Sequence, residues 1–266
     1  MTFDALIFDV DGTLADTEEL HRQAFNEAFF ACGVDWHWGP ALYAELLQIT
    51  GGKERIAYYL SGRQMSAAER HDLLRLIPQM HATKTRLYRE LVALGHLRPR
   101  AGVVRLMKEA RATGVKLAIA STTSPENVES LLLSSFGSDA PQWFGAIATG
   151  DVVPNKKPAP DIYNLALKQL GVGPKRAIAF EDSAVGVRSA KAAGLFTIAT
   201  PSLWTIRQDF SAADLVLTSL ADPDKPLCAT DEKRLGARYL GLRQLATLHA
   251  AALPPAAALR LEEAHA

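Results

Sequence analysis

The fold is decided by the stretch from Ala5 to Leu14, which reads ALIFDVDGTL. Its first four residues are apolar and run directly into acids, as in a parallel strand that is buried on both faces. Comparable apolar runs recur later in the chain, at Val115–Ala120, Ala177–Phe180, Phe196–Ala199 and Leu215–Leu217. We interpret each of these runs as a strand of one buried sheet.

Segments of helical length separate these strands, and most of them end at a glycine. They are Ala101–Thr113 before Gly114, Pro160–Leu170 before Gly171, and Ser183–Ala193 before Gly194; a further one opens at Ser124-Pro125. Glycine is the usual residue just after a helix, and proline is common at its first position. The alternation predicts an α/β fold with a doubly wound, Rossmann-like parallel sheet that carries helices on both faces.

One long stretch breaks this alternation. From about Ala15 to about Gly95 the sequence shows helical periodicity and no convincing strand, most clearly in Glu18–Cys32 and Ser66–Leu94. An insert of this size is typical of a separate domain. We therefore expect a catalytic core in residues 1–14 and 97–227, an all-helical cap in residues 15–96, and a C-terminal helical extension, one helix and a frayed tail, in residues 228–266.

Composition excludes several classes of protein. The formal net charge is zero, with 29 acidic and 29 basic residues, so a nucleic-acid partner is not expected. No apolar run approaches the roughly 18 residues that a membrane span needs, and the N-terminus lacks a signal-peptide pattern. Cys32 and Cys228 match neither a zinc site nor a disulfide framework. We expect a cytoplasmic monomer without a membrane partner.

Asp9 and Asp11 follow the first strand directly, at the end where ligands bind in open α/β sheets. Two carboxylates this close repel each other and need a cation or a shared proton, and Mg²⁺ is the hard cation that suits them. An EF-hand loop is excluded, because three of its required positions hold Thr13, Leu14 and Leu20. Taken alone, the two acids also fit an ordinary polar turn.

Three further signals follow in order, each after a strand. Ser121–Ser124 is a hydroxyl cluster that suits a helix cap and, secondarily, a phosphate site. Lys157 lies in a proline-stiffened loop, although a lysine there is also ordinary surface. Glu181 and Asp182 form a second acid pair. Phosphoryl transfer needs this set of groups: a carboxylate nucleophile, a metal, and donors for the phosphoryl oxygens.

These motifs resemble the four signatures of the haloacid dehalogenase superfamily, in order and over residues 1 to about 220. The corresponding residues are Asp9–Thr13, Ser121, Lys157 with Pro158, and Glu181-Asp182. A helical insert between the first two signatures implies the subgroup of β-phosphoglucomutase and phosphoglycolate phosphatase. Within it, four segments resemble the CbbY-type enzymes, xylulose-1,5-bisphosphate phosphatases that clear an inhibitor of Rubisco: Thr17–His21, Gly33–Trp36, Thr50–Ile56 and His81–Thr85.

The resemblance implies a catalytic role for four residues. Asp9 attacks phosphorus and becomes an aspartyl phosphate. Asp11 protonates the leaving sugar oxygen and then deprotonates the water that hydrolyses the intermediate. Lys157 neutralises charge between the nucleophile and the phosphoryl group, whose oxygens Ser121 and backbone N–H groups bind.

The resemblance also implies a metal site and a substrate site. Mg²⁺ is expected on the carboxylates of Asp9 and Asp182 and the backbone carbonyl of Asp11, with Glu181 ligating it or positioning water. Lys53 and Arg55 are expected to hold a second phosphate, and Glu18 and His21 to contact sugar hydroxyls. The expected substrate-binding residues are Glu18, His21, Thr50, Gly51, Gly52, Lys53, Arg55, Lys84 and Thr122.

Several functions share this core. A phosphosugar mutase uses the same catalytic residues, and within the resemblance Glu18 favours the phosphatase. A phosphoglycolate phosphatase has a two-carbon substrate with no use for Lys53 and Arg55. A non-enzymatic relative usually lacks the nucleophile or the second acid, and both are present in this chain. The sequence therefore predicts a Mg²⁺-dependent phosphatase for a sugar bisphosphate.

Overall fold

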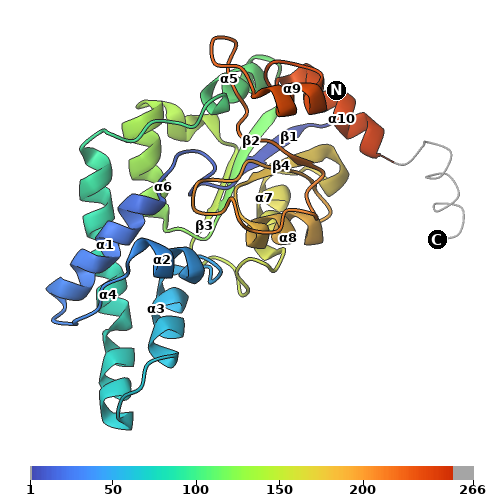
Figure 1. Cartoon of the computed structure of the whole chain (residues 1–266). Coiled ribbons are helices and arrows are strands. Elements are labelled where there is room, and N and C mark those ends of the chain that lie inside the picture. The colour runs from blue at the N-terminus through green and yellow to red at the C-terminus, as the bar shows by residue number, and fades with distance from the viewer. Residues whose placement is uncertain (1, 254–266) are drawn as a thin grey trace, which may run out of the picture.

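The computed structural model of the chain describes residues 2–253, and its sheet confirms the predicted fold class (Figure 1). Six parallel strands lie in the order β3-β2-β1-β4-β5-β6. Their bounds are β1 Ala5–Phe8, β2 Lys116–Ser121, β3 Ala146–Thr149, β4 Ala177–Glu181, β5 Phe196–Ala199 and β6 Leu215–Val216. The strand of the opening motif, β1, thus lies in the middle of the sheet, between β2 and β4.

The strand β3 was missed by the sequence analysis. It lies at the edge of the sheet and pairs only with β2 among the described residues. Its side chains are small, apart from Ile147, which is 39% exposed. An edge strand with so few large apolar residues has no buried run that periodicity can detect.

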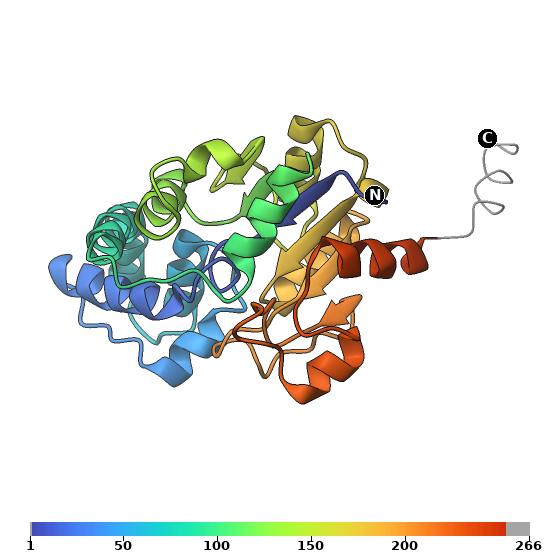
Figure 2. The same cartoon turned by 90° about the horizontal axis from the view of Figure 1, so that it is seen from above.

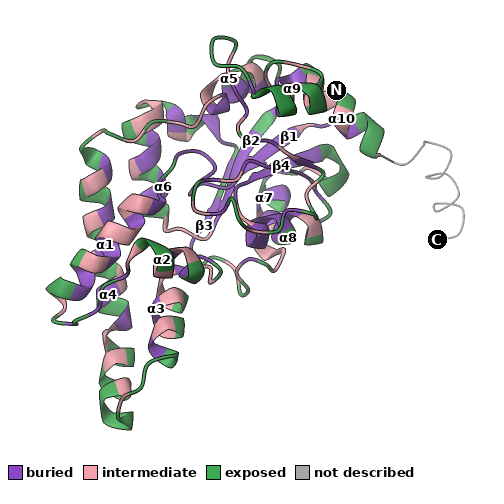
Figure 3. Cartoon of the chain, viewed as in Figure 1, coloured by how far each residue is buried: buried purple, intermediate pink, exposed green. Residues whose placement is uncertain are grey.

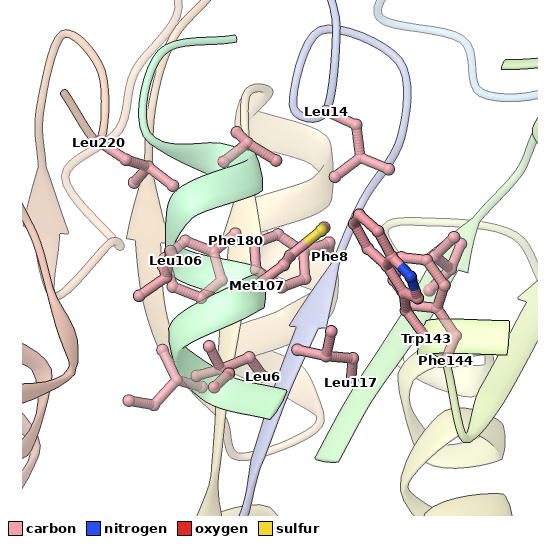
Figure 4. Close-up of a cluster of buried hydrophobic side chains, with 14 of the residues drawn as sticks. Leu6, Phe8, Leu14, Leu106, Met107, Leu117, Trp143, Phe144, Phe180 and Leu220 are labelled. Atoms are coloured by element: carbon pink, nitrogen blue, oxygen red, sulfur yellow. The ribbon is translucent and has the colours of Figure 1, made fainter. Parts of the chain in front are cut away.

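Helices cover both faces of the sheet, as a doubly wound fold requires. Leu6 and Phe8 of β1 face one cluster of buried side chains, which α5 (Val103–Ala112), α6 (Pro125–Leu131) and α10 (Leu242–Ala252) help to build. Figure 4 shows Met107 of α5 over β1 in this cluster. On the opposite face, α7 (Asp161–Leu170) and α8 (Ala184–Ala192) pack against Ala5 and Ile7. The alternation along β1 therefore fills two cores.

Residues 16–95 are helical and contain no strand. Their helices are α1 (Glu18–Ala31), α2 (Pro40–Leu46), α3 (Gly52–Ser61) and α4 (Ala67–Ala93). α1 packs along α4, and a cluster of aromatic side chains fills the space among the four helices. In Figures 1 and 2 these helices lie on one side of the sheet, away from α10. Figure 3 shows that the buried residues gather in the strands and on the inner faces of the helices.

The C-terminal region differs from the expectation of a single helix. Between residues 228 and 253 the structure has two helices, α9 (Ala229–Leu235) and α10, because Gly236 adopts a left-handed conformation that ends α9. The first backbone N–H of α10, at Leu242, donates to the carboxylate of Glu109 on α5 at 3.2 Å. The extension is thereby fixed to the core, and the predicted tail at residues 254–266 lies outside the described residues.

None of the helices within residues 2–253 combines the length and the apolar character that a membrane span requires.

Candidate active site

A cavity of about 480 Å³ opens between the carboxyl ends of the central strands and the helices α1, α3 and α4. Every residue that the sequence predicted for the site lines it, except Glu181, which lies directly behind its wall. Segments from both ends of the chain therefore meet around one space. The roles assigned to the individual residues stay predictions.

Asp9 lies at the floor of this cavity, at the end of β1. The ammonium group of Lys157 donates to Oδ1 of Asp9 at 2.7 Å and to Oε1 of Glu181 at 2.6 Å. Burial, opposed by Lys157 and reinforced by the charge of Glu181, raises the pKa of Asp9 to about 8. One lysine between two buried carboxylates leaves a surplus of negative charge, which a cation would relieve.

The chemistry of the donor set fits a divalent cation. Carboxylate oxygens of Asp9, Glu181 and Asp182 all lie within 4.8 Å of one another, and all three residues are buried. Burial and the charges of the other two acids raise the pKa of Asp182 well above its usual range. Hard oxygen ligands at this spacing suit Mg²⁺. The carboxylate of Asp11 is not a member of the cluster.

Gly12 brings the turn after β1 against this cluster. Its φ is +80°, and a Cβ there would lie 2.1 Å from Oδ2 of Asp182. Only glycine fits this combination of conformation and closeness. The absence of a side chain at Gly12 therefore leaves room for the carboxylate of Asp182 beside Asp9 and Glu181.

Asp11 is held by partners from the helices rather than by the metal cluster. Its Oδ1 accepts hydrogen bonds from Thr17 Oγ1 at 2.7 Å and from His21 Nε2 at 2.8 Å. Lys84 donates to the other ring nitrogen of His21 at 2.7 Å, and the imidazole stacks on Tyr88 with 3.9 Å between ring centroids. Because the ammonium group needs Nδ1 as an acceptor, the imidazole carries its proton on Nε2.

The contacts with Thr17 and with the His21–Lys84 pair set the charge of Asp11. Burial acts to raise the pKa of Asp11, but the interaction with His21, the hydrogen bond from Thr17 and the charge of Lys84 hold it below the usual range. Asp11 is thus a carboxylate in the substrate-free site. Lys84, which the resemblance implied as a substrate-binding residue, is linked to Asp11 through His21.

The groups predicted for a second phosphate are engaged within the protein. Lys53 donates to Asp151 at 2.6 Å, and Lys156 lies 2.7 Å from the same carboxylate. Arg55 uses Nε to bind the carbonyls of Leu46 and Ile49, at 3.1 and 3.3 Å. A phosphate that reaches Lys53 must therefore compete with Asp151, whose side chain is 55% exposed at the rim of the cavity.

The remaining predicted residues have structural partners as well. Thr50 donates its hydroxyl to the backbone carbonyl of Lys157 at 2.6 Å. Ser121 accepts the N–H of Thr123 at 3.3 Å, while Ser124, not Ser121, caps α6. At Gly52 a Cβ would lie 2.6 Å from His81, so this glycine makes room for an imidazole at the cavity wall.

The sequence analysis missed several residues that shape the site. Tyr163 of α7 donates to Oε1 of Glu181 at 2.6 Å, and Thr205 donates to Oδ2 of Asp182 at 3.3 Å. Tyr43 of α2 donates to Oε2 of Glu18 at 2.7 Å. None of them belongs to a motif. An inward-facing tyrosine in a helix has the same pattern as a core residue, so the sequence carries no signal for these contacts.

Comparison with known proteins is consistent with this geometry. The family model described as haloacid dehalogenase-like hydrolase matches residues 3–194. Protein CbbY of Cereibacter sphaeroides is 49% identical over 219 residues, which cover 82% of this chain and 93% of that protein. Protein CbbY of Rhodobacter capsulatus is 47% identical over 221 residues, covering 83% and 95%.

One similar solved structure holds a sugar bisphosphate. It is a mutant of CbbY from Rhodobacter sphaeroides in complex with xylulose 1,5-bisphosphate. Its sequence is 48% identical to this chain, its TM-score is 0.77, and the match covers 83% of this chain and 96% of that one.

Proposed function

The chain belongs to the haloacid dehalogenase-like hydrolase family and is a phosphoric monoester hydrolase, and we propose that it is a Mg²⁺-dependent sugar-phosphate phosphatase with Asp9 as nucleophile. The observation that carries this proposal is the pair formed by Asp9 and Lys157 at the floor of a polar cavity. A carboxylate can approach a phosphate dianion only where cations offset both charges.

In the first step Asp9 attacks phosphorus. Lys157 occupies Oδ1, and within the described residues Oδ2 accepts no hydrogen bond, so Oδ2 is the attacking atom. The new bond joins Oδ2 to phosphorus, the bond from phosphorus to the sugar oxygen breaks, and Asp11 gives that oxygen a proton. Asp11 takes up this proton from solvent as the substrate binds, because the incoming dianion beside it favours the neutral carboxyl.

In the second step water replaces the protein on phosphorus. Asp11, now a carboxylate, takes a proton from the water as its oxygen bonds to phosphorus, and Asp9 leaves as a carboxylate. The hydrogen bonds from Thr17 and His21 hold Asp11 in place for both transfers. Asp9, Glu181 and Asp182 would hold Mg²⁺. The bound cation supplies positive charge that stabilises the phosphoryl oxygens.

The proposed substrate is a sugar bisphosphate, with xylulose 1,5-bisphosphate as the specific candidate and its 1-phosphate as the group removed. Support comes from Lys53 and Arg55, which line the same cavity as Asp9 and Asp11, and from the ligand of the similar CbbY structure. In this proposal residues 15–96 act as a cap over the core formed by residues 1–14 and 97–227. The resemblance to CbbY-type enzymes further implies relief of Rubisco inhibition. We also propose that the enzyme acts in the cytoplasm as a monomer.

A phosphate-release screen over sugar monophosphates and bisphosphates tests this function. Xylulose 1,5-bisphosphate and ribulose 1,5-bisphosphate belong in the panel, because both are 2-ketopentose bisphosphates and they differ only in the configuration at C3. We expect the highest kcat/KM for xylulose 1,5-bisphosphate. Conversion of a sugar phosphate to its isomer without phosphate release would instead identify a mutase, and a preference for phosphoglycolate would contradict the bisphosphate assignment.

Removal of divalent metal should stop turnover. Three buried carboxylates with a single lysine among them cannot accept a further dianion without added positive charge. Chelation followed by dialysis should lower kcat by at least about 10³-fold, and Mg²⁺ should restore it. Thermal melting of the metal-free protein with and without Mg²⁺ provides a second readout. An unchanged rate after chelation would contradict the metal assignment.

Lys53→Ala should weaken binding of bisphosphates selectively. The side chain of Lys53 is 43% exposed and already paired with Asp151, so the net effect is modest, and we expect KM for a sugar bisphosphate to rise about fivefold to tenfold. For phenyl phosphate KM should not change. The matched control is Lys108→Ala, an exposed lysine of α5 outside the cavity. Equal rises for both substrates would argue against a second phosphate at Lys53.

A further inference from the structure

The hydroxyl of Tyr43 lies between the buried acid Glu18 and the partly buried cation Arg55. It donates to Oε2 of Glu18 at 2.7 Å and accepts from Nη1 of Arg55 at 3.3 Å. Tyr43 is fully buried, with 0% of its surface exposed. Burial, reinforced by the charge of Glu18, raises the pKa of Tyr43 well above its usual range, so the hydroxyl stays a donor. The three groups form a fixed chain from Arg55 to Glu18.

Packing leaves the ring of Tyr43 little freedom. The edge of Trp204, from the loop after β5, meets it with 5.4 Å between ring centroids, and the guanidinium of Arg55 lies 5.4 Å from its centroid. Arg55 in turn is held by two backbone carbonyls, those of Leu46 and Ile49. Since neither the ring nor its cationic neighbour can move independently, the direction of the hydroxyl is set.

Glu18 faces the cavity, whereas Tyr43 does not line it. Within residues 2–253, Tyr43 is the one hydrogen-bond donor to the carboxylate of Glu18, and Oε1 has none. Asp11 and Asp182 line the same cavity, and their charges repel that of Glu18. Without Tyr43 nothing in this set would keep Oε1 directed at a ligand.

We propose that Tyr43 is a positioning residue that sets the preference of this enzyme for hydroxylated sugar phosphates, by holding Glu18 so that Oε1 accepts a hydrogen bond from a sugar hydroxyl. This inference rests on the proposed function. It differs from a packing role in one respect: loss of the hydroxyl changes the choice of substrate and leaves phosphoryl transfer intact. A substrate without hydroxyl groups makes no use of Glu18.

Tyr43→Phe tests the proposal because it keeps the ring and removes only the hydroxyl. For xylulose 1,5-bisphosphate we expect kcat/KM to fall about tenfold to thirtyfold, mainly through KM, because a hydrogen bond to a charged group is lost. For phenyl phosphate kcat/KM should stay within about twofold. Tyr59→Phe is the matched control, since Tyr59 packs in the same aromatic cluster and its hydroxyl has no hydrogen bond within the described residues.

A double-mutant cycle with Glu18→Gln separates positioning from packing. If Tyr43 acts through Glu18, the double variant should lose no more than Glu18→Gln alone, whereas independent effects would multiply. Equal losses on both substrates, or multiplied losses in the double variant, would overturn the inference. If Tyr43→Phe fails to fold, Glu18→Gln alone provides the test. A fall in kcat/KM for phenyl phosphate equal to that for xylulose 1,5-bisphosphate would then overturn the inference.

The wild-type protein separates this inference from the proposed function. A wild type that hydrolyses phenyl phosphate as well as any sugar phosphate would refute the sugar-phosphatase assignment, and the role of Tyr43 with it. A wild type that prefers the sugar bisphosphate, combined with a Tyr43→Phe variant that keeps this preference, would refute the role of Tyr43 alone.

Discussion

Asp9→Asn should abolish phosphatase activity while leaving the fold intact. Loss of a covalent nucleophile costs other enzymes on the order of 10⁶ in kcat, and we expect at least about 10³-fold here. Asparagine has nearly the same shape, and it removes one charge from a cluster whose burial raises the pKa of Asp9 to about 8. The melting temperature should therefore be unchanged or higher. Steady-state phosphate release and thermal melting measure the two effects.

The control is Asp4→Asn, the same chemical change just before the other end of β1, where the carboxylate pairs with Arg176 at the surface. It should retain activity. Reduction of the phospho-enzyme with borohydride adds a direct readout, because an aspartyl phosphate is converted to homoserine at its own position. Homoserine at any position other than 9, or substantial activity in Asp9→Asn, would contradict the nucleophile assignment.

Lys157→Met should damage both stability and catalysis. Lys157 is buried and is the cation that bonds Asp9 and Glu181, so its removal leaves two buried carboxylates without compensation. Breaking a buried pair in this way typically costs about 3–5 kcal/mol in the free energy of unfolding. Turnover should fall by at least about 10²-fold, because the positive charge at the nucleophile is lost. Denaturant unfolding and steady-state kinetics provide the measurements.

Two variants sharpen this prediction. Lys156→Met is the matched control: its ammonium group pairs with Glu54 and Asp151 near the surface, where such pairs contribute at most about 1 kcal/mol. Lys157→Met combined with Glu181→Gln should regain part of the lost stability without regaining turnover. If Lys157→Met unfolds at the same denaturant concentration as the wild type, the charge-compensation account is wrong.

The architecture was predictable because its signals are local. Apolar runs that end in polar residues identify β1, β2, β4 and β5, and the glycine after α7 ends that helix as expected. Strand β3 lacks a buried run and was missed, and Gly236 divides a segment that composition alone describes as one helix. The local pattern thus succeeds where an apolar run is continuous, at the edge strand β6 as well as in the middle of the sheet, and fails at β3, which lacks such a run, and at the break between α9 and α10.

The candidate site was predictable to the same extent. Asp9, Lys157 and Asp182 follow strands, and the parallel sheet brings strand ends together whatever the intervening sequence. The hydrogen-bond partners of these residues could not be predicted from the sequence. Tyr163 reaches Glu181 across the packing of α7 on the sheet, and Asp151 reaches Lys53 from a loop. Such contacts depend on how elements pack, for which one sequence carries no pattern.

The hydrogen bond from Thr50 to the carbonyl of Lys157 has a consequence for selectivity. It joins the helical insert to the main chain of the residue that neutralises the nucleophile. Movement of α3 away from the core breaks this bond, and the ammonium group is then held less firmly against Asp9. A ligand too short to bridge the two halves of the molecule leaves the reaction without that support. Under the proposed function, we expect such a ligand to turn over slowly as well as to bind weakly.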